Sequence, residues 1–433
     1  MHFVNHFLWN APIIFLLFGT HLYFTFRLGF IQKMLPKAIR LSLSAKESSA
    51  KGISPLASLA TALAATLGTG NIIGISTAIS IGGPGAVFWC WLTGLFGIAT
   101  CYAESFLAVK FRKTDAIKGY TGGPMYVLEN ALHMKKLAKA FAFFTLFASF
   151  GIGSSVQANS IRCGIQELYN LSSHWIGITA SLLAGTVMLG GIRQISRVCT
   201  KLVPFMSLFY LTGCGYLLIL NRKYLFSALC LITQSAFSSK SLAGGIAGTN
   251  VIIALRTGIS KGLFTNEAGL GSIPIMAAAT SSPSPVKQGL VSMTGPFWDT
   301  VVMCSITGIV IVSSMLHFPA DFTALSSDRL CFAAFSHLPA FGIQILSISL
   351  ILFAFSTILG WCYYGECCID YLFHGKGTKL YQIIYIVFIY LGAVMSLSFV
   401  WELSDLLNLL MAIPNLLCIW LLQREITTKD LAL

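Results

Sequence analysis

The sequence predicts an all-α polytopic membrane protein with about eleven transmembrane helices. Hydrophobic residues make up 56% of the 433 residues, and charged residues only 10%. The mean hydropathy of +0.78 excludes a soluble globular protein with an ordinary charged surface. Windows of roughly 19 residues, the length that crosses ~30 Å of hydrocarbon, identify repeated apolar segments. Two of these segments are interrupted by glycine-rich polar sequence.

The first apolar segment covers about Leu8 to Tyr23. It lacks a basic n-region and a small-residue cleavage site, and Arg27 follows it, so we interpret it as a retained helix. The ten further segments lie at about residues 55–80, 85–109, 139–161, 174–192, 204–220, 244–280, 290–313, 341–364, 381–399 and 403–422. Segment 244–280 is too long for one simple span, so we expect a short helix followed by a broken one.

Lysine and arginine gather on one side of this arrangement. Thirteen of the 28 lie in the stretches 27–51 and 110–139. The positive-inside rule makes these loops cytoplasmic, which places the N-terminus outside and the C-terminus in the cytoplasm of a plasma (bacterial inner) membrane. The basic excess serves topology and contact with anionic lipid. The basic loops lack the interleaved aromatics of a nucleic-acid binder, and no obligate protein partner is indicated.

Ten segments after the first helix divide into two groups of five. The first segment of each group is the broken one, and the predicted orientation makes these two segments run in opposite directions. This arrangement is typical of an inverted-repeat transporter with a site near the midplane. We therefore expect an N-terminal helix and basic loop, two five-helix repeats and a short tail, at residues 1–54, 55–220, 244–422 and 423–433.

The first break is Gly68-Thr69-Gly70-Asn71. A helix interrupted at bilayer depth exposes backbone groups that lipid cannot satisfy, so such a break persists where it lines a cavity. Thr69 and Asn71 favour a site for a ligand or ion. The alternative is helix packing, since Gly70 and Gly74 have G-x-x-x-G spacing.

The second break covers Gly262–Ser272 and contains Glu267. A carboxylate at this depth costs on the order of 2.5 to 3.5 kcal/mol, so it needs a protein or water partner. Glu267 is either a coupling or gating group, or a cap for freed backbone N–H groups. Asp299, in a later segment, relays a proton or pairs with Arg256 or Lys261, and we favour the pairing.

The sequence indicates no cofactor and, beyond a coupling cation, no metal. The twelve cysteines form no C-x-x-C pair and have no histidine at ligand spacing, so we interpret them as packing residues. Paired carboxylates and Ser-His sets at catalytic spacing are also missing, which argues against an enzyme. A passive channel, with the broken helices as its filter, is the alternative of a different class.

Several ordered motifs are long enough to be specific: GTGNI at 68–72, GGPGAVFWCW at 82–91, GLFTNEAGLGS at 262–272 and FSTILGWCYYGE at 355–366. With them the chain resembles the alanine-or-glycine:cation symporter family over nearly its whole length. The resemblance implies a sodium-coupled, in some members proton-coupled, importer of small neutral amino acids such as alanine or glycine. It also implies the leucine-transporter type of fold and alternating access.

The resemblance also implies the site residues. Those expected around the amino acid are Gly70, Asn71, Gln157, Asn266, Gly269, Thr357 and Trp361, those expected around Na⁺ are Leu67, Gly70, Ser356 and Thr357, and the coupling candidates are Glu267, Glu104 and Asp299. Each has a structural alternative: an interhelical hydrogen bond for Gln157, core packing for Trp361, back-bonding to the helix for the hydroxyls, and a helix-end carboxylate for Glu104.

The physical chemistry of an amino acid agrees with these assignments. Its carboxylate favours the positive end of a half helix and free backbone N–H groups, which both breaks supply. Its ammonium favours carbonyl oxygens from unwound backbone, Gln157 or Asn71. Trp361 lies four residues after Thr357, on the same helical face, where a large side chain favours small substrates. The choice of amino acid, sodium or proton coupling, and the oligomeric state are left open.

Overall fold

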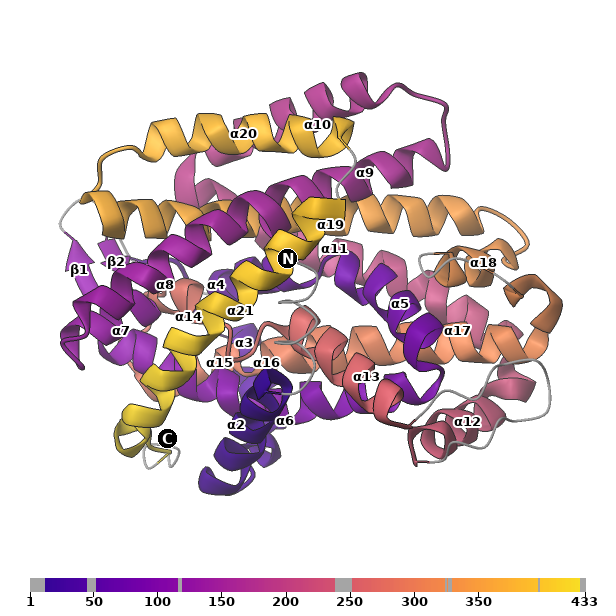
Figure 1. Ribbon diagram of the computed structural model, residues 1–433, viewed down its shortest axis with the longest axis horizontal. Coiled ribbons are helices and arrows are strands. Elements are labelled where there is room, and N and C mark those ends of the chain that lie inside the picture. The colour runs from indigo at the N-terminus through magenta and orange to yellow at the C-terminus, as the bar shows by residue number, and fades with distance from the viewer. Residues whose placement is uncertain are drawn as a thin grey trace.

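The computed structural model describes residues 12–44, 52–115, 119–237, 251–323, 325, 329–395 and 398–428. Most of the described chain is helical, and the long helices run roughly along the longest axis of the molecule (Figure 1). A small β-hairpin and α7 lie at one end of this bundle, and α12 and α18 lie at the other (Figure 1). The shorter elements thus lie at the two ends of the bundle, and the long helices span the distance between them (Figure 1).

The described chain begins with α2 (Pro12–Arg27), which continues the first predicted segment. A turn with left-handed backbone at Gly29 and Phe30 then leads through η1 (Ile31–Met34) into α3 (Leu35–Ser44). The helices on the two sides of this turn are bent by 67°. Helix α3 buries Ala38 and Ser42 and exposes its charged face, so it is amphipathic rather than uniformly apolar.

The predicted first break is confirmed. Helix α4 (Pro55–Thr66) begins after the Ser54 cap, whose Oγ accepts from the Ala57 amide at 3.1 Å. It ends at the break, where η2 (Thr69–Asn71) leads into α5 (Ile73–Gly82). The two halves are bent by 60°. Backbone groups around Gly68 therefore lack part of their helical pairing and face the centre of the molecule.

Long helices follow where the apolar segments predict them. These elements are α6 (Gly85–Lys110), α8 (Lys135–Ala148), the π-helical η3 (Ser149–Ser155), α9 (Val156–Gln166), α10 (Ser173–Met188) and α11 (Gly191–Leu220). The basic stretch after α6 also holds structure that the sequence analysis did not predict. It forms the antiparallel strands β1 (Lys113–Asp115) and β2 (Gly119–Thr121), followed by α7 (Pro124–Asn130).

The second half contains a second break between α13 (Val251–Asn266) and α14 (Ile273–Ala278). Glu267, Gly269 and Gly271 adopt left-handed backbone there, with φ of 53°, 84° and 90°. Glycine tolerates this conformation without steric cost, which accounts for its density in the break. The short helix expected before α13 falls on residues outside the described ranges.

The remaining elements complete the bundle. They are η4 (Arg222–Tyr224), α12 (Leu225–Phe237), α15 (Pro285–Ser292), α16 (Thr294–Pro296), the π-helical η5 (Phe297–Cys304), α17 (Ser305–His317), η6 (Pro319–Phe322), α18 (Leu330–Ser336), α19 (Gly342–Phe373), α20 (Thr378–Val394), α21 (Ser398–Leu421) and η7 (Gln423–Glu425). Helix α12 was not predicted from the sequence. Helix α19 passes through the centre, beside both α4 and α9 (Figure 1).

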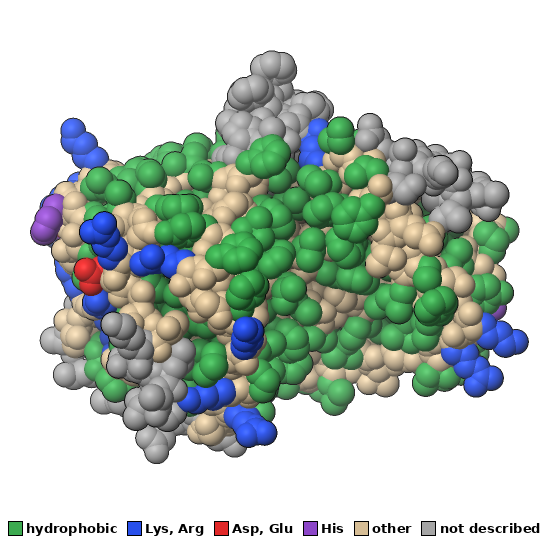
Figure 2. All heavy atoms as spheres, turned by 90° about the horizontal axis from the view of Figure 1, so that it is seen from below, with side chains coloured by type: hydrophobic (Ala, Val, Ile, Leu, Met, Phe, Trp, Pro, Cys, Tyr) green, Lys and Arg blue, Asp and Glu red, His purple; other side chains and the backbone are tan. Residues whose placement is uncertain are grey.

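The described helices fit a multi-pass membrane protein. Five are long and apolar enough to cross a bilayer, and two bent pairs raise the number to seven when each pair counts as one span. Figure 2 shows a face covered mostly by hydrophobic side chains, on which nearly all visible charges are Lys or Arg. Such a surface is favourable against lipid and unfavourable against water. The count of eleven crossings stays a prediction.

Candidate functional site

A small cavity lies between the two breaks. Its volume is about 20 Å³, and its walls come from α4, α9, α13, α19, α21, η3 and both breaks. The lining residues are Ala65, Thr66, Gly68, Thr69, Gly70, Ile152, Gln157, Phe264, Thr265, Glu267, Thr357, Trp361 and Asn408. This volume holds about one water molecule. Of the predicted site residues, the cavity brings together Gly70, Gln157, Glu267, Thr357 and Trp361.

Asn71 holds the first break in shape. Its Oδ1 accepts from the Gly68 amide at 3.0 Å, and its Nδ2 donates to Asp299 Oδ1 at 2.7 Å and to the Asp299 carbonyl at 3.2 Å. The Asn71 side chain thus provides hydrogen-bond partners for two buried groups. These are the Gly68 amide, which has no partner within the helix, and the Asp299 carboxyl group. Asn71 is fully buried but does not line the cavity. Its geometry fits a positioning role.

Helix α19 approaches α4 closely enough for hydroxyl groups to reach the break. A Cβ at Gly360 would lie 2.7 to 2.9 Å from Ala65, so only glycine permits this approach. Ser356 Oγ donates to the Ala64 carbonyl at 3.2 Å and to the Phe353 carbonyl at 2.9 Å. In an unbroken helix the Ala64 carbonyl would accept from the Gly68 amide. Here the Gly68 amide donates to Asn71 Oδ1 instead, and the Ala64 carbonyl accepts from Ser356 Oγ.

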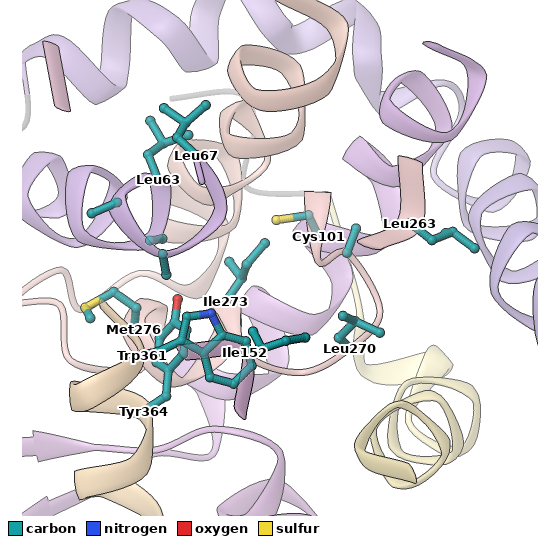
Figure 3. Close-up of a cluster of buried hydrophobic side chains, with 14 of the residues drawn as sticks. Leu63, Leu67, Cys101, Ile152, Leu263, Leu270, Ile273, Met276, Trp361 and Tyr364 are labelled. Atoms are coloured by element: carbon teal, nitrogen blue, oxygen red, sulfur yellow. The ribbon is translucent and has the colours of Figure 1, made fainter. Parts of the chain in front are cut away.

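Thr357 stands beside Gly68 on the cavity wall. Its Oγ1 donates back to the Phe353 carbonyl at 3.0 Å, and a Cβ at Gly68 would lie 2.8 Å from this oxygen. Thr357 and Ser356 both use their protons on carbonyls, which leaves hydroxyl lone pairs free for a cation. Hard oxygen donors of this kind suit Na⁺. Leu67 contributes only backbone here, because its side chain points away from Trp361 (Figure 3).

Gln157 presents an unpaired acceptor to the cavity. Its Nε2 donates to the Ile152 carbonyl at 3.1 Å, one turn earlier at the π-helical η3. Its Oε1 is buried and has no hydrogen-bond partner within the described part of the chain. A buried amide oxygen without a partner is costly, and a ligand ammonium would satisfy it. The expected interhelical hydrogen bond does not account for this oxygen.

Glu267 links the second break to α19. Its Oε1 accepts from Trp361 Nε1 at 3.2 Å, and its Oε2 accepts from Ser272 Oγ. Trp361 is fully buried, beside Ile152 and Tyr364 (Figure 3). One alternative for Glu267 was a cap for backbone N–H groups, whereas in the described structure its partners are the side chains of Ser272 and Trp361. The carboxyl group therefore connects the break to the cavity wall.

Two predicted substrate residues face away from the cavity. Asn266 Oδ1 accepts from the Ala268 amide at 2.9 Å, and its side chain points toward Gly97 of α6. A Cβ at Gly269 would meet Leu17 of α2 and Leu416 of α21. Neither residue lines the cavity. Asn266 is the last residue of α13, so its direction follows that helix, whereas Gly269 lies among the left-handed residues of the break.

Asp299 does not form the ion pair that the sequence analysis favoured. Its carboxyl oxygens accept from Asn71 Nδ2 and from Thr300 Oγ1, each at 2.7 Å. The described residues contain no salt bridge from Asp299 to Arg256 or Lys261, so that prediction was wrong. Sequence does not specify the helical phase that turns this carboxyl inward.

Glu104 also differs from its favoured alternative as a helix-end carboxylate. It is 2% exposed, and its Oε2 accepts from Asn415 Nδ2 at 2.8 Å. The same Nδ2 donates to the Gly269 carbonyl at 2.9 Å, which ties α6, α21 and the second break together. Asn415 lies in α21, in the sequence MAIPN at 411–415, and it is a residue that the sequence analysis did not select as a site residue.

Sequence reasoning also missed cavity residues. Thr265 lies next to the predicted Asn266. Its Oγ1 donates a hydrogen bond to the Gly262 carbonyl and lies 3.4 Å from Thr300 Oγ1. Asn408 reaches the cavity from α21, and its buried Oδ1 lacks a partner among the described residues. Both are polar residues inside apolar segments, and this could have identified them in the sequence. Membrane helices rarely turn a polar side chain toward lipid.

Comparison with known proteins agrees with this geometry. Residues 1–431 match the sodium:alanine symporter family. The chain belongs to this family. The sodium/alanine symporter AgcS of Methanococcus maripaludis is 44% identical to this symporter over 436 residues, covering 99% of this chain and 95% of AgcS. The probable sodium/glutamine symporter GlnT of Bacillus subtilis is 36% identical over 432 residues, covering 98% and 88%.

A solved structure gives the fold. The symporter is similar to MhsT, solved in complex with L-phenylalanine, with a TM-score of 0.63 and 16% identity over 85% of this chain and 88% of that one. This likeness shows the leucine-transporter type of fold that the sequence predicts. Family and fold together make the chain a multi-pass membrane transporter rather than an enzyme.

Proposed function

We propose that this symporter imports small neutral amino acids such as alanine or glycine, driven by co-binding of Na⁺, through alternating access. The observation that carries the proposal is the cavity between the two breaks, with an unpaired amide oxygen on one wall and hydroxyl groups on another. The names of AgcS and GlnT support sodium as the coupling ion and an amino acid as the solute.

The amino acid would bind across the two breaks. Its ammonium would donate to Gln157 Oε1, and its carboxylate would accept from backbone amides at the first break around Gly70. Trp361 would cover its side chain and limit it to a small size. Asn266 and Gly269 would act through the shape of the second break, because they face α6 and α21 instead of the cavity.

Sodium would bind beside the amino acid. Ser356 Oγ, Thr357 Oγ1 and carbonyl oxygens at the end of α4, including that of Leu67, would supply its ligands. Thr357 would face both solutes, because it also lines the cavity. Ion and amino acid would then each raise the affinity of the other, which is the requirement for coupled transport. Glu267, Glu104 and Asp299 would position the breaks.

The architecture in the membrane is part of the proposal. Residues 1–54 would form the first helix and a basic cytoplasmic loop, 55–220 and 244–422 two oppositely oriented five-helix repeats, and 423–433 a cytoplasmic tail. The N-terminus would lie outside. The concentration of Lys and Arg in the stretches 27–51 and 110–139 supports this orientation.

Uptake of labelled alanine, glycine and glutamine into proteoliposomes tests the proposal. The arms are an inward sodium gradient, an inward proton gradient and no gradient. We expect saturable accumulation of alanine and glycine that requires sodium. Accumulation driven by protons alone would assign the coupling to the buried carboxyl groups, and gradient-independent, unsaturable flux would indicate a channel. Trp361→Ala should extend uptake to glutamine, and unchanged selectivity would contradict the role of this wall.

A further inference from the structure

A second cavity, an apolar groove, lies on the other side of α4 from the central cavity. It has a volume of about 590 Å³, within the ~300–1,000 Å³ of ordinary small-molecule sites. Its lining residues come from α3, α4, α11 and η5, and they are Ile39, Ser42, Leu43, Leu56, Leu59, Ala60, Leu63, Leu67, Thr200, Val203, Pro204, Ser207, Leu208, Leu211, Trp298, Val302 and Met303. Only three of these carry a hydroxyl group, so the cavity suits an apolar occupant.

Helix α4 separates this groove from the site between the breaks. The groove residues on α4 are Leu56, Leu59, Ala60, Leu63 and Leu67, which share one helical face, whereas Ala65 and Thr66 line the central cavity. Figure 3 shows Leu63 and Leu67 pointing away from Trp361. Leu67 is the residue at which α4 ends before the break. An occupant of the groove therefore rests directly against the first break.

The groove opens onto the apolar outer surface. Leu43 and Leu208 line it and are 61% and 68% exposed, and Trp298 is 37% exposed. An apolar groove at a surface that lipid surrounds is filled by acyl chains, because water inside it would lack hydrogen-bond partners. The connection 45–51 has the polar sequence AKESSAK and does not match such a groove. Lipid is thus the occupant that the surroundings supply.

The charges beside the groove select the headgroup. Arg40 is exposed between the lining residues Ile39 and Ser42 on α3, and Lys201 is exposed next to Thr200 on α11. The lining helices α3 and α4 contain no Asp or Glu, and neither does 196–211 of α11. The fourth lining element, η5, contains Asp299, which is buried and turned toward Asn71. Each cation beside an anionic lipid surface raises binding by a factor of about five.

We infer that this groove binds an anionic glycerophospholipid, with one acyl chain between α4 and α11 and its phosphate between Arg40 and Lys201. The lipid would belong to the leaflet on the α3 side. The site is separate from the amino-acid site, and its occupancy does not depend on which solute is transported.

Photolabelling of the full-length protein tests this site. The protein is reconstituted in phosphatidylcholine vesicles that contain a trace of phosphatidylglycerol with a diazirine on its acyl chain, or of the phosphatidylcholine with the same chain. Adducts are mapped by peptide mass spectrometry. We expect adducts on the groove faces of α4 and α11, with phosphatidylglycerol favoured by at least fivefold and up to about 25-fold.

Two variants separate the contribution of the charged residues from that of the apolar groove. Arg40→Gln with Lys201→Gln should reduce phosphatidylglycerol labelling of the groove to the phosphatidylcholine level, while Lys136→Gln with Lys379→Gln, an equal loss of exposed charge elsewhere, should not. Ser207→Phe should fill the groove and lower its labelling by either lipid. Equal labelling by both headgroups, unchanged labelling in the Arg40 and Lys201 variant, or adducts spread evenly over exposed leucines such as Leu182 would overturn the inference. Labelling requires no transport, so its failure is distinct from failure of the proposed function.

Discussion

Replacement of Asn71 by alanine is the most informative perturbation of the central site. It removes the acceptor for the Gly68 amide and the donor to Asp299 Oδ1 and to the Asp299 carbonyl. Leaving a buried polar group without its hydrogen-bond partner costs about 1–3 kcal/mol. The cap and the carboxyl contact together are therefore worth at least about 2 kcal/mol, which is about thirty-fold in an equilibrium constant.

The expected result is a loss of at least about thirty-fold in sodium-driven alanine uptake at low concentrations of both solutes, since the break loses its shape. The assay is the initial uptake rate in proteoliposomes, normalised to reconstituted protein. Asn159→Ala is the matched control. Asn159 is half-buried in α9, and its side-chain contact is a weak one from Cys163 Sγ at 3.9 Å. We expect the control to stay within about twofold of wild type.

A double-mutant cycle isolates the contact between Asn71 and Asp299. Asn71→Ala, Asp299→Ala and the double variant should give a coupling free energy of about 1 kcal/mol or more, because the donor and acceptor are 2.7 Å apart and each substitution removes one of them. A coupling below about 0.5 kcal/mol would refute the reasoning. So would an Asn71→Ala variant that transports as fast as the Asn159→Ala control.

Two further predictions concern the first break and the α7 end of the molecule. Gly68→Ala should lower sodium-dependent uptake by about fivefold or more, because overpacking against Thr357 Oγ1 costs ~1–3 kcal/mol; Gly74→Ala, with nothing within 4 Å, should transport normally in the same assay. The hydrogen bond from Tyr371 holds the pKa of Glu129 below its ordinary value of 4.5, so this contact stabilises the protein above that pH and its contribution is lost as pH falls through the lowered pKa. Melting temperatures of wild type and Tyr371→Phe should therefore differ more at about pH 7 than at about pH 4, and an equal difference at both would contradict the assignment.

The sequence predicts the long helices and the breaks because both have strong local signals. An apolar run of about 20 residues and a GTGN interruption determine structure with little help from distant contacts. The strands β1 and β2 and helix α7 lack such a signal, since they are short and lie in a polar, basic stretch. They form where that stretch packs against the bundle, through contacts such as Arg112 Nη1 to the Thr280 carbonyl at 2.6 Å.

The direction of individual side chains is the part that sequence does not determine. Gln157 and Thr357 line the cavity, because each lies in a helix whose position the fold sets. Asn266 is the last residue of α13, whose helical phase turns its side chain toward α6. Gly269 follows in the break, where its own left-handed backbone places it against α2 and α21. Asp299 pairs with Asn71 across 228 positions of the chain, and a contact between such distant residues depends on tertiary packing.

The size of the central cavity limits how affinity measurements can be interpreted. A space for one water does not admit alanine, so this conformation is closed and binding requires a wider one. The apparent dissociation constant then equals the intrinsic one divided by the fraction of molecules that are wide enough. A substitution that loosens the approach of α19 to α4 at Gly360 would strengthen apparent binding without contacting the ligand. Tighter binding in a variant is consequently no proof that the altered residue touches the amino acid.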